Sequence, residues 1–405
     1  MSTATDPGGD RFHLSQLIYD TRYRSMTIQT VAFIGLVAAF TWLISNTVQN
    51  LETLGKDFNF GFLGERAGYD INQRLVEYSS DSSHGRAALV GVLNTLLVAF
   101  LGCILATVIG VLAGVLRLSQ NWLTARLMTI YIESFRNVPV LLWIIAFFAV
   151  LTESTPAPRA FRGENPTASM MLGDSVAVTN RGTYIPSPVW GDGSMVVVIV
   201  FLLSLVGIWW FGRYAKARQE ATGDILPTFW IKLGIFFVPA ILVYFIMGQP
   251  ITLSYPELKG FNFSGGLHLR NSLIALWLAL SIYTGAFIAE NVRAGILAVS
   301  KGQTEAAYAL GLRPNRTMNL VILPQALRVI IPPLISQYLN LTKNSSLALA
   351  VGYMDLRSTL GGITVNQTGR ELEGILLMML IYLTVSLLIS AVGNVYNNSV
   401  KLKER

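Results

Sequence analysis

The sequence predicts an all-α, polytopic membrane protein with about eight transmembrane helices. Hydrophobic residues make up 52% of the chain and charged residues 13%, which is about half the charged share of a soluble globular protein. The apolar residues also gather in charge-free runs, most of which reach the roughly 20 residues that a helix needs to cross the hydrocarbon layer. Because only elements with internally paired backbones fit in that layer, these runs predict helices.

Seven of the eight helices rest on charge-free runs. The runs are Ser25–Leu51, Ala87–Leu116, Asn137–Thr152, Gly193–Gly212, Leu233–Pro256, Asn271–Ala289 and Gly374–Val400. The eighth lies between Arg328 and Lys343, which bracket a shorter apolar run, and Arg136 beside Pro139 is expected to start the third helix at the membrane surface. The predicted spans are 27–48, 88–116, 128–152, 194–212, 231–250, 271–290, 327–350 and 375–397.

Basic residues predict the orientation, because Lys and Arg concentrate in cytoplasmic loops. With a cytoplasmic N-terminus, the inside segments hold Arg22, Arg24, Arg117, Arg126, Arg213, Lys216, Arg218, Arg293, Lys301, Arg313, Arg316, Lys401, Lys403 and Arg405. The outside segment 49–86 has six acids against four bases. Both ends are therefore expected in the cytoplasm, with the second outer loop spanning 153–192.

This reading divides the chain into six parts. They are a cytoplasmic N-terminal segment (1–26), a first helix with an outer loop (27–86), a first core part (87–152), a section with outer loops and two further helices (153–270), a second core part (271–400) and a cytoplasmic tail (401–405).

Several function classes lack their signatures. The chain has no G-x-x-x-x-G-K-[ST] phosphate loop, so we expect no ATPase site of its own. It has no nucleophile elbow and no zinc-spaced histidine pair, so we expect neither catalytic nor metal-binding residues. The net charge of +7 suits membrane anchoring better than nucleic-acid binding. Cys103 is the single cysteine, which excludes an intrachain disulfide. The first apolar run starts late and lacks a cleavage pattern, which indicates a retained helix.

The loop between the sixth and seventh predicted helices, residues 290–325, has the strongest local signals. Ser300 and Gln303 have the spacing of a capping box at a helix start. Gly311 suits the left-handed residue that ends a helix, and Pro314 follows where continuation is blocked. Asn315 is placed to cap a second short helix that runs to Pro324. Two short helices at a steep angle would form a rigid knob; the alternative is a solvated connecting helix.

The full pattern of this loop resembles the signature loop of ATP-binding-cassette (ABC) importer permeases. Glu305-Ala306-Ala307 is followed after three residues by Gly311 and after nine more by Val321-Ile322-Leu323-Pro324. The resemblance implies that Gln303, Glu305, Ala306, Ala307, Gly311 and Pro324 dock on a dimer of separate ATPase subunits. ATP would be bound by those subunits, and this chain would need no cofactor. Val321 stands where the pattern usually has Ile.

Flanking motifs resemble the polar amino-acid permeases. They are Gly91–Leu96, Tyr131–Pro139, Glu290–Ile296, Pro324–Arg328 and Lys343–Leu347, and they cover the five-helix core of a type I ABC importer permease. The length and the tract Leu17–Arg22 resemble the long permeases of general L-amino-acid or glutamate/glutamine/aspartate/asparagine importers.

This family implies transport of polar L-amino acids across the bacterial inner membrane. It also implies a periplasmic solute-binding protein and a second, related permease chain as partners. The section 153–270 departs from a minimal family member. Its two further helices keep the loop that follows on the cytoplasmic side.

Polar residues inside predicted helices are candidates for the substrate pathway. Lys343, with Asn344 and Ser345, would present donors to a substrate carboxylate, because an intramembrane cation usually faces a cavity. The alternative is that Lys343 lies near a bilayer edge and extends its charge into water. Asn94 and Thr95 raise the same question, with hydrogen bonding between helices as the alternative.

Two further expectations follow from the residues. Gly110-x-x-x-Gly114 predicts a close helix contact, and Glu290 and Arg293 are spaced to pair on one helix face.

Two other functions would each need a pattern that this sequence lacks. A secondary transporter would need residues for a coupling ion and two related halves. A membrane enzyme would need a cluster of catalytic residues.

Overall fold

The computed structural model describes residues 21–53, 55, 57–163 and 165–400. Most of the predicted N-terminal segment 1–26 and the whole tail 401–405 lie outside the described residues. The chain forms two compact units, Met1–Phe62 and Leu63–Arg405. The first unit contains helix α2 (Thr21–Thr53), which extends beyond the predicted 27–48 at both ends. Its apolar side chains are exposed along its length, as expected of a helix that faces lipid.

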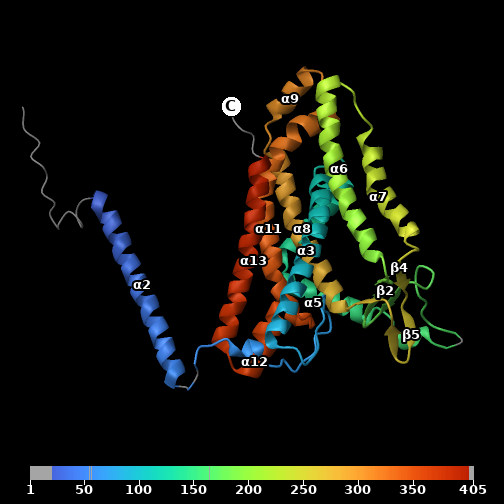
Figure 1. Ribbon diagram of the computed structural model, residues 1–405. Helices are drawn as coiled ribbons and strands as arrows, with labels where there is room; N and C mark the ends of the chain where they lie inside the picture. The colour runs from blue at the N-terminus through green and yellow to red at the C-terminus, as the bar shows by residue number, and fades with distance from the viewer. Residues whose placement is uncertain (1–20, 54, 56, 164, 401–405) are drawn as a thin grey trace, which may run out of the picture. The chain divides into compact units, whose positions relative to one another are not determined.

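The second unit contains the remaining helices and all the described strands (Figure 1). The α-helices are α3 (His84–Leu116), α4 (Trp122–Asn137), α5 (Val140–Glu153), α6 (Ser194–Thr222), α7 (Thr228–Ile246), α8 (Asn271–Leu297), α9 (Lys301–Ala309), α10 (Pro314–Thr317), α11 (Leu323–Asn344), α12 (Val365–Thr368) and α13 (Glu371–Val400). Helical turns of other types cover η1 (Gly61–Gly64), η2 (Pro158–Phe161), η3 (Met318–Ile322), η4 (Ser345–Val351) and η5 (Arg357–Thr364). In the described chain, eight helical segments are long and apolar enough to cross a membrane, which confirms the predicted fold class.

Helix α8 is the centre of the second unit, with α3, α4, α5 and α11 packed around it. Gly110 and Gly114 of α3 face α8 at close range. A Cβ atom at Gly110 would lie 2.5 Å from Ile288 Cβ, and one at Gly114 would lie 2.6 Å from the Ala289 carbonyl oxygen. Only glycine leaves room for this contact, so the predicted close packing of the Gly110-x-x-x-Gly114 pair is confirmed.

The third predicted helix, 128–152, is wrong as a single element. It is divided into α4 and α5 at Val138, which has an extended backbone (φ −111°, ψ 134°), and Pro139. Proline has no backbone N–H to donate and disfavours a helical conformation at the residue before it. The apolar span accordingly starts at Val140, and α4 is a separate helix that packs on α3 and α8.

The section 153–270 contains strands that the sequence did not predict. The strands are β1 (Ala177–Thr179), β2 (Gly182–Ile185), β3 (Ser187–Trp190), β4 (Ile251–Ser254), β5 (Glu257–Lys259), β6 (Asn262–Ser264) and β7 (Leu267–Leu269). They pair antiparallel in the orders β1-β2-β7, β3-β4 and β5-β6. The two loops on either side of α6 and α7 therefore fold together, on a small core of Ala177, Tyr184 and Phe263. The two predicted helices are present as α6 and α7, which pack on each other.

The loop after the first predicted helix is also folded. Within residues 63–83, Ala67, Ile71 and Tyr78 form a buried cluster with Ala87 and Val90 of α3. This segment and residues 352–370 lie together at the end of the second unit that carries α12, opposite α9 (Figure 1). Both segments are held to α3 by hydrogen bonds described below.

Candidate functional sites

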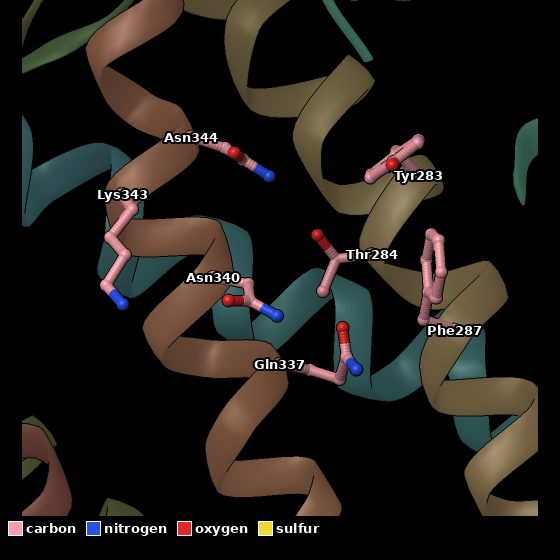
Figure 2. A pocket seen from close by; sticks show the side chains of 7 residues that line it. All are labelled: Tyr283, Thr284, Phe287, Gln337, Asn340, Lys343 and Asn344. Atoms are coloured by element: carbon pink, nitrogen blue, oxygen red, sulfur yellow. The ribbon is translucent and has the colours of Figure 1, made fainter. Parts of the chain in front are cut away.

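A polar cavity of about 280 Å³ lies between α8 and α11 (Figure 2). Its lining consists of Tyr283, Thr284 and Phe287 from α8 and Gln337, Asn340, Lys343 and Asn344 from α11. Three of these side chains are carboxamides, which each offer both a donor and an acceptor. The lining contains one cation and no carboxylate, so the cavity is polar with a positive bias.

Helical periodicity places the three carboxamides together. Gln337, Asn340 and Asn344 are spaced by three and four residues, which puts them on one face of α11. In Figure 2 their side chains point toward α8, where Thr284 points back toward them. Lys343 lies at the edge of this group, and its Nζ has no hydrogen-bond or ion-pair partner among the described residues. The site is thus a set of neutral polar groups with one unpaired cation beside it.

Two of the predicted pathway residues, Lys343 and Asn344, line this cavity, and three do not. Ser345 is buried and donates to the Thr342 carbonyl. Asn94 is fully buried and donates to the carbonyls of Gln73 and Met354.

Thr95 accepts from the Leu356 backbone N–H and donates to the Gly91 carbonyl. Asn94 and Thr95 therefore join α3 to segments 63–83 and 352–370. These hydrogen bonds between elements agree with the structural role given above as the alternative to a place in the substrate pathway. Their role in transport stays a prediction.

Charged residues from three helices meet one helical turn from Phe287. Glu290 of α8 accepts from Arg117, at the end of α3, at 2.5 Å and from Arg293 at 2.5 Å. Arg117 also lies 3.4 Å from Glu133 of α4. The predicted pair of Glu290 and Arg293 is confirmed, and it belongs to a larger network that ties α3, α4 and α8 together beside the cavity.

Helix α9 carries four of the six predicted docking residues, whereas Gly311 follows it and Pro324 lies in α11. Gln303, Glu305 and Ala306 are exposed, and Ala307 is buried. Tyr308 and Leu310 are exposed to 49% and 82%, and Lys301 is exposed as well, so the surface combines apolar groups with one cation and one carboxylate. Gln303 accepts a hydrogen bond from Gln325 of α11 at 3.4 Å, which links α9 to the neighbouring membrane helix.

The end of α9 has the geometry that the sequence predicted. Gly311 has a left-handed backbone (φ +77°). Its N–H donates to the Tyr308 carbonyl, and the Leu312 N–H donates to the Ala307 carbonyl. This pair of bonds is a Schellman motif, which ends a helix and reverses the chain.

The predicted second short helix is wrong as a separate element. Helical structure resumes at Pro314 and continues through Pro324 into α11, so Asn315 lies inside the helix and Arg313 is the N-cap residue. Proline is favourable in the first helical turn, where no backbone N–H is needed, which suits Pro314. Pro324 lies inside the continuous helical run, two residues after η3. The predicted docking segment therefore consists of α9 and the start of the long helical segment that follows it from Pro314. The predicted cap at Ser300 also lacks its side-chain bond.

Sequence reasoning missed Gln337, Asn340, Tyr283, Thr284 and Phe287 as cavity residues. Gln337, Asn340 and Asn344 share one face of an otherwise apolar helix. A search for polar residues at helical spacing would have found them. The three residues of α8 carry no such pattern, because an aromatic residue or a threonine in a membrane helix is ordinary.

Known proteins resemble this chain along its length. A protein family described as binding-protein-dependent transport system inner membrane component matches residues 222–401, which include α9 and the polar cavity. The glutamate/glutamine/aspartate/asparagine transport system permease protein BztB of Rhodobacter capsulatus is 57% identical over 429 aligned positions, covering 100% of both chains. The general L-amino acid transport system permease protein AapQ of Rhizobium johnstonii is 43% identical, over 98% of this chain and 97% of that protein. The putative amino-acid ABC transporter permease protein YhdX of Escherichia coli is 44% identical, over 94% and 95%.

Proposed function

This chain belongs to the permease subunits of amino-acid ABC importers, and from that premise we propose that it moves polar L-amino acids past the α8–α11 cavity under the control of an ATPase docked on α9. The observation that carries the proposal is the cavity lined by Gln337, Asn340 and Asn344 beside Lys343.

The lining suits a small solute that carries both signs of charge. The amide N–H groups and the Lys343 ammonium donate to a carboxylate, and the amide carbonyls and the Thr284 hydroxyl accept from an ammonium group. The same groups suit a side-chain carboxylate or carboxamide. Because the lining has a cation and no carboxylate, a cationic side chain would be unpaired and repelled. Glutamate, glutamine, aspartate and asparagine, the substrates in the name of the 57% identical relative, fit this pattern.

The α9 surface supports docking of a separate ATPase subunit. Its exposed groups include Ala306, Tyr308 and Leu310 beside Lys301, Gln303 and Glu305, and an apolar patch with polar groups around it is typical of a protein interface. Movement of α9 would pass to α11 through the Gln303–Gln325 contact and the helical run that starts at Pro314. Since α11 also lines the cavity, docking and substrate passage share one element.

The remaining partners and the membrane placement are further parts of the proposal. We place α9 on the cytoplasmic side of the bacterial inner membrane, with both chain ends on that side, and the strands β1–β7 on the outer side. A periplasmic binding protein would deliver the solute, and a second, related permease chain would complete the pathway.

Transport in proteoliposomes tests the role of the cavity. The permease is reconstituted with its ATPase, second permease and binding protein, and uptake of labelled glutamate is measured. Asn340→Leu and Lys343→Ala should each lower uptake at least severalfold with assembly intact. Ser336→Ala, an exposed position of α11 outside the lining, is the matched control. Unchanged uptake in both cavity variants would contradict the pathway, and competition by arginine as strong as by glutamine would contradict the substrate class.

Co-purification tests the docking surface separately. Glu305→Lys should abolish recovery of the ATPase with the permease, because it reverses the charge of the single carboxylate on α9. Glu220→Lys makes the same charge change at an exposed residue of α6 that takes part only in a loose 3.8 Å surface pair. Full ATPase recovery with Glu305→Lys, or equal loss with both variants, would contradict the proposal.

A further inference from the structure

Helices α6 and α7 form a hairpin that has little protein around it. The two helices pack on each other, and α7 has no fully buried residue. The hairpin joins the β strands at one end, and its other end, where α6 leads into α7, lies at the same end of the second unit as α9 (Figure 1). Most side chains of the hairpin therefore have no contact with the rest of the described chain.

A group of exposed aromatic side chains lies toward the α9 end of this hairpin. They are Trp209, Trp210 and Tyr214 on α6 and Phe229 and Trp230 on α7. Trp210 and Trp230 are 65% and 69% exposed. Tryptophan and tyrosine concentrate where the hydrocarbon layer meets the lipid headgroups, so this group marks the headgroup level on the hairpin.

Four cations lie at the same level, and they fall into two classes. Lys216 pairs with Glu220 at 3.8 Å, and Arg218 pairs with Asp224 at 3.4 Å. Arg213 and Lys232 have no acidic partner among the residues that the structure describes. Their counter-charge must come from outside the described chain.

The two unpaired cations lie on different helices at a similar level of the hairpin. The Arg213 guanidinium lies over the Trp209 ring, 3.9 Å from its centroid. The Lys232 side chain of α7 lies against Gly212 of α6, where its Nζ would be 3.4 Å from a Cβ atom on that glycine. Gly212 and Arg213 are adjacent in sequence, so both cations belong to one level of the hairpin.

We propose that Arg213 and Lys232 bind the headgroup of an anionic phospholipid, whose acyl chains lie along the apolar surface of α6 and α7. Two cations from two helices match a phosphodiester, which offers two charged oxygens to separate donors. The Trp209 ring holds the guanidinium in place through a cation–π contact. Basic residues next to a membrane span contribute about 1 kcal/mol each to attraction by anionic lipid. The site is independent of the cavity and rests only on insertion of the hairpin in the membrane.

Native mass spectrometry of the assembled transporter tests this site. The complex is delipidated in detergent and titrated with dioleoyl phosphatidylglycerol or dioleoyl phosphatidylcholine. The wild type should bind the anionic lipid more tightly than the zwitterionic one. Arg213→Gln with Lys232→Gln should weaken phosphatidylglycerol binding about thirtyfold, the value for two cations at about 1 kcal/mol each. Phosphatidylcholine binding should not change.

Two matched variants give the controls. Lys216→Gln with Arg218→Gln removes the same charge from the paired cations and should change phosphatidylglycerol binding less than about threefold. Arg213→Lys with Lys232→Arg keeps both charges and should retain preference for the anionic lipid. If the first double variant does not assemble, Arg213→Gln and Lys232→Gln are measured singly, each with an expected loss of about fivefold. Equal weakening by both charge-removing pairs, or no weakening by Arg213→Gln with Lys232→Gln, would overturn the proposal.

Discussion

The Arg117 guanidinium at the end of α3 donates to the Glu290 carboxylate of α8 at 2.5 Å. Their side chains are 17% and 24% exposed, so the pair is largely shielded from water. Glu290 also accepts from Arg293, so one carboxylate serves two guanidinium groups.

Glu290→Gln should lower the free energy of unfolding by about 1–3 kcal/mol, because it leaves Arg293 without its carboxylate partner and Arg117 with only the more exposed Glu133. Glu133→Gln is the control, since Glu133 is 48% exposed and 3.4 Å from Arg117. It should cost less than about 1 kcal/mol. Thermal unfolding of the purified complex measures the stability of both variants. Equal losses of stability would contradict the conclusion that Glu290 holds this charge network together.

Gly311→Ala should destabilise the end of α9 by about 1–2 kcal/mol, because an L-residue is strained in the left-handed conformation. A Cβ atom at this position meets nothing within 4 Å, so the cost is backbone strain alone. Asn, which tolerates that conformation, should cost less. Gly302→Ala, inside α9 with equal free space, should be neutral or stabilising. Under the proposed docking on α9, affinity for the ATPase subunit reports these changes, and an equal response to the two alanine variants would contradict this account.

Asp355 predicts a pH dependence of stability. It is fully buried, and its carboxylate accepts from the Ser358 N–H and hydroxyl and from the Tyr382 hydroxyl. Burial raises the pKa of Asp355 above its ordinary value, and the hydrogen bonds from Ser358 oppose this. The folded state therefore holds the proton more tightly than the unfolded state. This contribution is complete below the unfolded pKa of about 4 and is lost as pH rises through the folded pKa.

The unfolding temperature should fall between pH 4 and pH 8 as Asp355 loses its proton, and Asp355→Asn should remove this contribution to the fall. Ser358→Ala should make the decline steeper, because it removes a donor that favours the charged carboxylate. Unfolding scans in detergent across this range measure both slopes. Identical slopes in the wild type and Asp355→Asn would contradict the assignment.

Ile71→Ala should cost about 2–5 kcal/mol, the range for removing a buried aliphatic side chain. Ile71 is 1% exposed in the cluster that holds segment 63–83 on α3. Leu75→Ala, at a 56% exposed position of the same segment, should change stability by less than about 0.5 kcal/mol. Chemical unfolding measures the difference, and similar values would show that the segment does not pack as described.

The sequence predicted the spans well because hydrophobicity and charge act over local windows. Helix α8 begins at Asn271 as predicted, and it runs past 290 because Glu290 and Arg293 pair with each other and with Arg117 at its end. The end of α9 at Gly311 was predictable for the same reason, because the left-handed conformation depends on a glycine at that one position.

The remaining features depend on contacts that are distant in sequence. Strand β2 pairs with β7 through Thr183 and Leu269, which are far apart in the sequence. Strands of three and four residues are too short to show a pattern from which this pairing could be predicted. The cavity was not predicted because Gln337 and Asn340 are uncharged, and a search by charge and hydropathy does not single out uncharged side chains. The role of Asn94 depends on the carbonyls of Gln73 and Met354, which only the folded chain brings to it.

The pairing of Ile185 with Leu267 has a consequence for how this protein can be shortened. Directly opposed residues on antiparallel strands are about 5 Å apart, so the chain leaves and re-enters the β1-β2-β7 sheet at neighbouring points. The stretch between them, which includes α6 and α7, can be replaced by a short connection, at the loss of the contact between Phe263 and Tyr184. A tight two-residue turn joining the two strands would excise residues 186–266 and preserve the alternation of sides for every helix that follows.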